Sequence, residues 1–317
     1  MPTTFGGTLD EPKAAVKVFV TGGTGFVGSR LVPFLVQAGH RVHLLLRDQE
    51  RRPPASPEIT VSVGDPNRPG TWWEPLAGCD GAVNLAGHPI FCRWTAKVKA
   101  LIRDSRVATT RNLVAALPGD RPFPLVSASG IGIYGDSGER ELDEDSPRGG
   151  DFLARVAQDW EAEALRGANR GARVCCLRLG VVFGPDGGAL PELVRNVRQR
   201  HTGRLGTGRQ WMSWIHREDV VAGIRFLLEN PALSGPFNFA APEPRRQADV
   251  AHTLGRLLDC HRLVPAPLFA IRVMLGEAAE LAQFSQRGVP RRLLEAGFRF
   301  QHPHLEPALQ ELLAAMP

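Results

Sequence analysis

Three glycines near the start of the chain, Gly22, Gly25 and Gly28, have a spacing that suits phosphate binding. They follow an apolar, β-branched stretch at residues 16–20 and open an amphipathic run at residues 25–38. In a strand–turn–helix unit, such glycines permit a tight turn, close approach of a pyrophosphate, and packing of the helix on the strand. The helix N-terminus then presents N–H groups to the phosphates, so the sequence predicts a bound dinucleotide. The residues expected to hold it are Gly22, Thr24, Gly25, Phe26, Val27 and Gly28.

The residue after the second strand indicates which dinucleotide binds. Residues 41–46 are predicted to form this strand, and Arg47 follows at the point where an acidic residue would hold a ribose 2′-hydroxyl. A guanidinium at this point can pair with a 2′-phosphate instead, so NADP(H) is favoured over NAD(H). Asp48 follows directly and weakens this prediction slightly.

Further contacts to the dinucleotide are expected where other strands end. A strand at 59–63 leads to Gly64 and Asp65, beside the expected adenine. A strand at 80–85 is followed by small residues that let the backbone pass close to the cofactor, and a strand at 123–129 ends in serines. The predicted contacts are Asp65, Leu85, Ala86, Gly87 and Ser127.

Predicted strands alternate with helices along most of the chain. Helices are expected at 95–117 and 152–170, and a sixth strand at 173–182. This alternation predicts an α/β fold, with a doubly wound parallel Rossmann sheet and a smaller, mainly helical C-terminal lobe. The expected domains are a flexible leader at 1–14, an NADP-binding domain at 15–184 plus about 211–240, and a substrate lobe at 185–210 plus 241–317.

The composition argues against several classes of function. The 317-residue chain carries a net charge of +5, with acidic residues between its many arginines and no long basic run, so we expect no nucleic-acid partner. It has neither a signal peptide nor an apolar run of membrane-spanning length, so we expect a cytoplasmic protein without membrane contact. The five cysteines lack C-x-x-C spacing, which favours free thiols and no metal site.

Motifs along nearly the whole chain resemble those of the extended short-chain dehydrogenase/reductases, within the NAD-dependent epimerase/dehydratase superfamily. They are Thr21-Gly-Gly-Thr-Gly-Phe-Val-Gly28, Asn84-Leu-Ala-Gly87, Ser127-Ala-Ser129 with Tyr134-Gly135, and Arg178 through Phe183-Gly-Pro185. Others resemble an atypical subfamily that is called sugar-nucleotide-epimerase-like or cell-division-inhibitor-like and has a characteristic C-terminal domain. They include Arg93-Trp94-Thr95, Asp159-Trp-Glu161, Gly206-Thr-Gly-Arg-Gln-Trp211 and Gln286-Arg-Gly-Val-Pro290. The resemblance implies a Rossmann domain, bound NADP(H), and a homodimer that pairs through helices near 95–117 and 152–170.

The usual catalytic residues of that superfamily are missing. Typical members use a serine and a tyrosine, with a lysine four residues after the tyrosine that lowers its pKa and holds the nicotinamide ribose. This chain has a single tyrosine, Tyr134, with Gly138 four residues later and no lysine after Lys99. We therefore expect Ser129 to hydrogen-bond a substrate oxygen and Tyr134 to supply a proton.

Histidines, an arginine and a tryptophan are the other candidates for the site. His88 lies in the loop expected over the cofactor. His216 is a further candidate acid, which we expect to be structural. The predicted substrate contacts are His88, Arg209 and Trp211.

Three functions remain compatible with the sequence. The first is an oxidoreductase that acts on a small carbonyl, hydroxyl or nucleotide-sugar-like substrate with replacement acids. The second is a sugar-nucleotide epimerase, which ranks lower because removal of a hydroxyl proton needs the missing base. The third is a non-catalytic NADP(H) sensor or scaffold that acts through a partner in processes such as cell-division control.

Overall fold

A parallel sheet of seven strands forms the larger part of the structure. The computed structural model describes residues 15–200, 202–260, 263–266 and 268–316, so the predicted leader at 1–14 lies outside the described residues. In spatial order the strands are β3 (Ile59–Val63), β2 (Arg41–Leu46), β1 (Lys17–Thr21), β4 (Gly81–Asn84), β5 (Phe123–Gly130), β7 (Ala172–Leu179) and β12 (Gly235–Phe239). All neighbouring pairs are parallel, and the winding direction reverses between β1 and β4. The predicted doubly wound Rossmann fold is confirmed.

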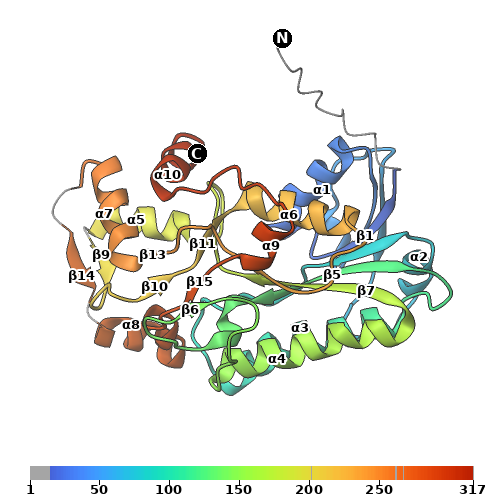
Figure 1. The fold of residues 1–317 in the computed structure, drawn as a ribbon, viewed down its shortest axis with the longest axis horizontal. Helices are drawn as coiled ribbons and strands as arrows, with labels where there is room; N and C mark the ends of the chain where they lie inside the picture. Colours follow the sequence, from blue (N-terminus) through green and yellow to red (C-terminus); the bar gives the residue numbers. More distant parts are fainter. Residues whose placement is uncertain (1–14, 201, 261–262, 267, 317) are drawn as a thin grey trace, which may run out of the picture.

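Helices cover both faces of this sheet (Figure 1). Because side chains alternate along a strand, Val18 and Val20 of β1 face one apolar core while Phe19 faces the other. The first core lies under α1 and α6, and the second lies under α2, α3 and α4. The bounds are α1 (Gly28–Gln37), α2 (Trp73–Ala77), α3 (Ala96–Ala115), α4 (Phe152–Leu165) and α6 (Arg217–Glu229).

A smaller lobe, mainly helical, lies to the left of the sheet in Figure 1. Apolar residues that include Leu190, Val250 and Leu309 form its core. Its helices are α5 (Leu190–Arg200), α7 (Gln247–Leu257), α8 (Leu268–Leu275) and α10 (Leu305–Ala314). Its short strand pairs are β9 (Thr202–Leu205) with β14 (Val264–Ala266) and β10 (Trp211–Met212) with β13 (Arg245–Arg246). The division of the chain into domains, with the boundaries given above, stays a prediction.

Short elements connect the lobe to the carboxyl end of the sheet. They are β8 (Val181–Phe183) paired with β11 (Trp214–His216), β6 (Glu141–Leu142) paired with β15 (Arg287–Gly288), and the helix α9 (Arg291–Glu295). The sequence predicts a single strand at residues 173–182. Gly180 divides it into β7 and β8, because a Cβ at Gly180 would lie 2.3 Å from the carbonyl oxygen of Ser213. β8 therefore leaves the main sheet and pairs with β11.

Two predicted helices also differ from the observed ones. The first helix begins at Gly28 rather than at Gly25, because the N–H of Gly25 closes a turn on the carbonyl of Gly22. The apolar periodicity of residues 266–284 predicts one helix there, but α8 ends at Leu275, because Gly276 has a φ of +61°. A 3₁₀ helix, Gly276–Ala282, follows it.

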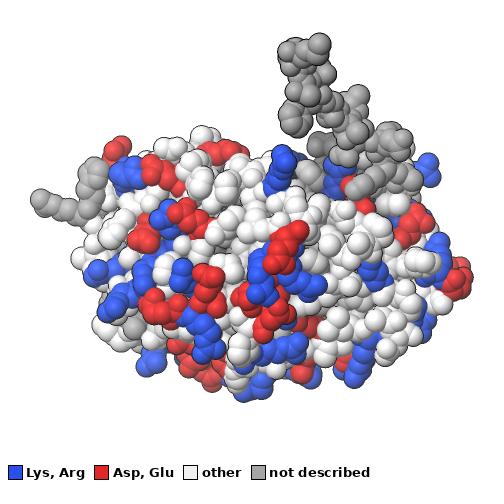
Figure 2. Space-filling model, in the orientation of Figure 1, with Lys and Arg blue, Asp and Glu red and all other residues white. Residues whose placement is uncertain are grey.

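Acidic and basic side chains are interspersed over the face of the molecule shown in Figure 2. All five cysteines are free, as the sequence predicts. Among the described residues, no helix combines the length and the apolar character needed to cross a bilayer.

Candidate functional site

The glycine turn between β1 and α1 is closed by the chain that follows β4. Gly22 has a φ of +70°, and a Cβ on it would lie 2.7 Å from the carbonyl carbon of Leu85. A Cβ on Gly28 would lie 2.2 Å from the carbonyl oxygen of Gly22. Both positions therefore require glycine, the first for its backbone conformation and the second for close packing of the helix on the turn.

The N-terminus of α1 is open to an anion. Its N-cap residue, Val27, makes no side-chain cap, and the first turn contains no acidic residue. Within the described part of the chain, the backbone N–H groups of Phe26 and Val27 donate no hydrogen bond. These free donors and the positive end of the helix dipole fit a pyrophosphate. The close backbone packing at Gly22 and Gly28 excludes any side chain at these two positions.

Phe26 supports the turn through its side chain. Its ring fills the space above a second group of glycines, Gly184, Gly187 and Gly188, where any added Cβ would lie within 3 Å of the ring. The guanidinium of Arg217, on α6, lies 5.0 Å from the centroid of the Phe26 ring. Phe26 therefore contributes its backbone to the predicted cofactor site and its ring to the packing. The glycine cluster after β8 was the signal in the sequence for this contact.

The side chains at the ends of β2 and β3 are exposed. Arg47 lies at the end of β2 and has no ion pair among the described residues. The carboxylate of Asp48 accepts a hydrogen bond from the backbone N–H of Glu50, so the acidic group caps its own short helix. Asp65 similarly accepts from the backbone N–H of Asn67. Asp48 is therefore less of an obstacle to a 2′-phosphate than the sequence suggests.

Ser127 does not lie at the surface of this site. Its side chain is fully buried in β5, and its hydroxyl accepts a hydrogen bond of 3.3 Å from the Asn84 amide. Asn84 also donates to Thr110 and accepts from Thr21, which ties β1, β4, β5 and α3 together. The predicted contact of the Ser127 side chain with the cofactor is therefore wrong, because this strand position faces the layer between sheet and helix.

Ser129 and Tyr134 also point into the protein. The Ser129 hydroxyl donates to Glu161 at 2.9 Å, and the residue is 3% exposed. The Tyr134 hydroxyl donates to Asn238 and accepts from Arg178, and burial raises its pKa to about 12. Neither hydroxyl is free to reach a substrate in this structure, which argues against the predicted catalytic roles of Ser129 and Tyr134.

Arg178 and Glu161 are the centre of this buried polar network. Arg178 forms two hydrogen bonds with the Glu161 carboxylate, at 2.8 and 2.9 Å, and a third with the carbonyl of Glu144. The carboxylate of Glu144 accepts from the backbone of Asn238 on β12 and of Arg292 on α9. The network therefore joins α4, three strand ends and α9. The sequence alone did not predict this buried network, although Arg178 inside the apolar run at 173–182 is a signal for it.

The chain after β4 places Gly87 and His88 over α3. Gly87 is exposed, and the His88 backbone N–H donates to the hydroxyl of Ser105 on α3 at 2.9 Å. A Cβ on Gly87 would lie 3.1 Å from Cζ of Arg106. This segment therefore brings a histidine and a partly buried arginine beside the phosphate turn. Nothing in the local sequence of Arg106 marks it as a site residue.

The two remaining predicted substrate residues lie elsewhere. Arg209 lines a hollow of about 300 Å³ between the loop at 136–139 and the lobe. Trp211 lies between the guanidiniums of Arg246 and Arg287, with its indole N–H donated to Glu139. Among the described residues, no hydrogen bond, ion pair or ring contact joins Arg209 or Trp211 to His88, and Trp211 of β10 packs against the two arginines.

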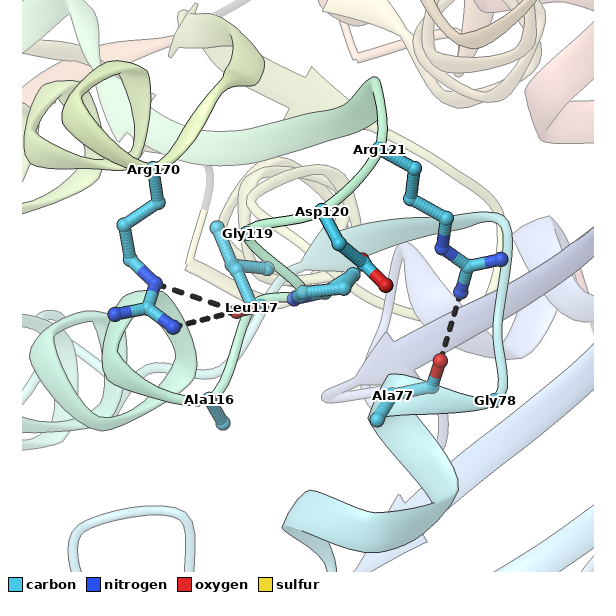
Figure 3. Close-up of a pocket in the computed structure, with 9 residues that line it drawn as sticks. Ala77, Gly78, Ala116, Leu117, Gly119, Asp120, Arg121 and Arg170 are labelled. Carbon is cyan, nitrogen blue, oxygen red and sulfur yellow. Dashed lines mark hydrogen bonds between the residues drawn. The ribbon is translucent and has the colours of Figure 1, made fainter.

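A larger hollow, of about 620 Å³, lies at the opposite edge of the sheet (Figure 3). It is lined by Ala77, Gly78, residues 116–121 and Arg170, which precede β4, β5 and β7. Arg170 donates to the carbonyl of Leu117, and Arg121 donates to that of Ala77. Its cationic groups are therefore bound to the protein itself, and ligands of such sheets bind at the carboxyl edge.

One side-chain cluster has the composition of a metal site. His216, His302 and Glu311 each place a ligand-type atom within 4.8 Å of the others. However, Nδ1 of His216 accepts the backbone N–H of Glu218 at the start of α6. A neutral imidazole that accepts through Nδ1 carries its proton on Nε2, which disfavours coordination by that atom. His216 therefore caps a helix, in agreement with its predicted structural role, and burial lowers its pKa to about 4.

Comparisons with known proteins agree with this architecture. Residues 18–240 match the model of the NAD dependent epimerase/dehydratase family, and residues 266–312 match a domain of unknown function, DUF1731. An Arabidopsis thaliana protein described as a chloroplastic homologue of epimerase family protein SDR39U1 is 37% identical over 96% of this chain and 88% of its own length. The Bacillus subtilis epimerase family protein YfhF is 36% identical over 94% of this chain and 98% of its own.

Solved structures show the same relationship. The human epimerase family protein SDR39U1, crystallised with NADPH, superposes with a TM-score of 0.82 at 31% identity and covers 95% of this chain and all of that one. A nucleoside-diphosphate sugar epimerase from Corynebacterium glutamicum superposes with a TM-score of 0.76 at 30% identity, over 96% of this chain and 59% of that one. The chain therefore belongs to the NAD dependent epimerase/dehydratase family.

Proposed function

We propose that this protein binds NADP(H) and is an oxidoreductase for a small carbonyl or hydroxyl substrate. The observation that carries the proposal is the open N-terminus of α1, where Gly22 and Gly28 leave space and free N–H groups for a pyrophosphate. The human relative that was solved with NADPH supports the choice of nucleotide. When bound, the nicotinamide supplies or accepts a hydride.

Arg47 would distinguish NADP(H) from NAD(H). Its guanidinium is exposed at the end of β2, and the neighbouring carboxylate of Asp48 is engaged by the backbone N–H of Glu50. A guanidinium forms strong, charge-assisted hydrogen bonds with phosphate oxygens. Arg47 therefore has both the charge and the freedom to pair with a 2′-phosphate.

His88 would supply the proton that Tyr134 cannot. Among the candidates that the sequence identified, Tyr134 is buried and paired, and His216 caps α6. His88 follows Gly87, is only partly buried, and is held by its backbone to Ser105. Imidazole is an effective proton donor near neutral pH.

Calorimetric titration with NADPH and NADH tests the binding proposal. We expect NADPH to bind about tenfold tighter than NADH, and Arg47→Ala to remove most of this preference. Arg41→Ala is the matched control, because Arg41 is an exposed arginine at the opposite end of the same strand. Equal affinities for the two nucleotides in the wild-type protein would contradict the assignment.

A second candidate function is that of an NADP(H) sensor without turnover. The burial of Ser129 and Tyr134 favours it, since both hydroxyls of the expected catalytic pair are used inside the protein. NADPH consumption measured over a panel of aldehydes and ketones separates the two functions. The oxidoreductase predicts a substrate whose turnover falls at least about tenfold in His88→Gln, whereas the sensor predicts no turnover with any of them.

A further inference from the structure

The side chain of Arg106 is held between α3, α4 and the chain after β4. Its guanidinium lies 5.2 Å from the centroid of the Trp160 ring on α4. The indole N–H of Trp160 donates to Thr110 at 2.8 Å, so this aromatic surface is fixed in place. On the other side, a Cβ on Gly87 would come within 3.1 Å of the guanidinium carbon. Arg106 is therefore a positioned side chain rather than a mobile surface charge.

The protein leaves most of the hydrogen-bonding capacity of this guanidinium unused. Among the described residues, Arg106 donates a single hydrogen bond, from Nη1 to the carbonyl of Ile102, and forms no ion pair. A guanidinium has five N–H donors. Burial lowers the pKa of Arg106 to about 10, and no carboxylate nearby opposes this effect. No nitrogen of Arg106 is both fully buried and unpaired, so its remaining N–H groups are accessible to an acceptor from outside the chain.

The position of Arg106 in the sheet indicates which part of a dinucleotide it faces. The winding of the sheet reverses between β1 and β4, and a dinucleotide crosses the carboxyl edge at such a point. Arg47 and Asp65 end β2 and β3, on the side expected for the adenosine half. Arg106 contacts Gly87 after β4 and Trp160 of α4, which lies beyond β5. It therefore lies on the side of the other half.

We propose that Arg106 is a positioning residue for the nicotinamide-ribose half of the bound dinucleotide. Its free N–H groups donate to oxygen atoms of that half, and the ligand supplies the acceptors that the protein lacks. Arg106 on α3 thereby provides a cation beside α4, in a chain with no lysine after Lys99. This assignment rests on the proposed binding of NADP(H).

Two ligands that share the adenosine half test the proposal. Calorimetric affinities for NADPH and for 2′,5′-ADP, which lacks the nicotinamide ribose, are measured for the wild-type protein, Arg106→Met and Arg106→Lys. We expect Arg106→Met to weaken NADPH at least about tenfold and to change 2′,5′-ADP by less than about twofold. Arg106→Lys retains the charge and should recover part of the NADPH affinity. Arg103→Met is the control, since Arg103 is exposed on the same helix and pairs with Asp159.

The outcomes separate this proposal from the proposed function. If Arg106→Met binds NADPH as tightly as the wild-type protein, Arg106 does not position the cofactor. If NADPH and 2′,5′-ADP weaken equally, Arg106 supports the turn as a whole and the assignment is overturned. If Arg106→Met does not fold, the ratio of the two affinities in Arg106→Lys decides, and an unchanged ratio rejects the proposal. Wild-type protein that binds neither ligand rejects the proposed function itself, and this assignment with it.

Discussion

Two arginines beside α4 differ in what surrounds them. Arg178 is 2% exposed, and its guanidinium is matched by the Glu161 carboxylate, the Tyr134 hydroxyl and the Glu144 carbonyl. Arg106 is partly buried, and the protein offers it one carbonyl and an aromatic ring. Burial is therefore a poor guide to function by itself. A buried polar group whose partners are all in the protein stabilises the fold, whereas one without them is available to a ligand.

The largest expected effect comes from breaking the satisfied network. Arg178→Met leaves the Glu161 carboxylate buried without its cation, so we expect the free energy of unfolding to fall by about 3–5 kcal/mol. Urea denaturation followed by circular dichroism measures this change. Arg111→Met is the matched control, because Arg111 itself is exposed and Glu163 keeps its second partner, Arg166, so the loss should be about 1 kcal/mol or less. Equal losses of unfolding free energy in the two variants would contradict the claim that the buried Arg178 pair stabilises the fold more than the Arg111 pair.

His43 is a buried group whose hydrogen-bond partners, like those of Arg178, all lie within the protein, but it is buried in its neutral form. His43 is 6% exposed between the hydroxyls of Thr60 and Ser62, and burial lowers its pKa to about 4. The folded state therefore binds fewer protons than the unfolded state between about pH 6.5 and pH 4. The stability contributed by neutral His43 is fully present above pH 6.5 and decreases as the pH falls through this window, by up to about 3 kcal/mol.

Unfolding measured at several pH values tests this contribution. We expect His43→Gln to lose stability less steeply than the wild-type protein between pH 6.5 and pH 4. His252→Gln is the control, because His252 is exposed on α7. A slope that His43→Gln leaves unchanged would show that His43 titrates alike in the folded and unfolded states.

The smallest effect on stability is expected at Arg106, with the opposite sign. Arg106→Met removes a cation that has no acidic partner and retains an apolar stem against Trp160. We expect the free energy of unfolding without ligand to stay constant or to rise by about 1 kcal/mol. Thermal and urea unfolding of the ligand-free protein measure it. A loss as large as that of Arg178→Met would place Arg106 among the structural arginines.

Local sequence was sufficient to predict the dinucleotide turn. Gly22, Gly25 and Gly28 lie in one strand–turn–helix unit, and the constraints on them arise within a few residues, apart from the approach of Leu85. The sheet was predictable for a similar reason, since β-branched runs and amphipathic helices alternate along the chain. The family followed from motifs spread over the same elements and is confirmed by the match over residues 18–240.

Local sequence was insufficient for the side chains at the end of β5. Ser127 was expected to contact the cofactor, and Ser129 and Tyr134 were expected to act in catalysis, but each hydroxyl is used by a distant partner. Ser127 meets Asn84, Ser129 meets Glu161, and Tyr134 meets Asn238, which is 104 residues away along the chain. A strand sequence shows which residues share a face, but the packing of helices decides whether that face is open.

The sequence by itself therefore determined the fold and the family, and it predicted the glycine turn, because glycine conformations and hydrophobic periodicity are local properties. Only the tertiary structure decided that Arg178 is neutralised within the protein and that Arg106 is not. The reason is that the groups around each arginine come from segments far apart in the chain. Glu144, for example, accepts from Arg178 through its carbonyl and from the backbone of Arg292 in the C-terminal segment through its carboxylate. Whether a buried charge is satisfied depends on which groups the completed fold places within hydrogen-bonding distance.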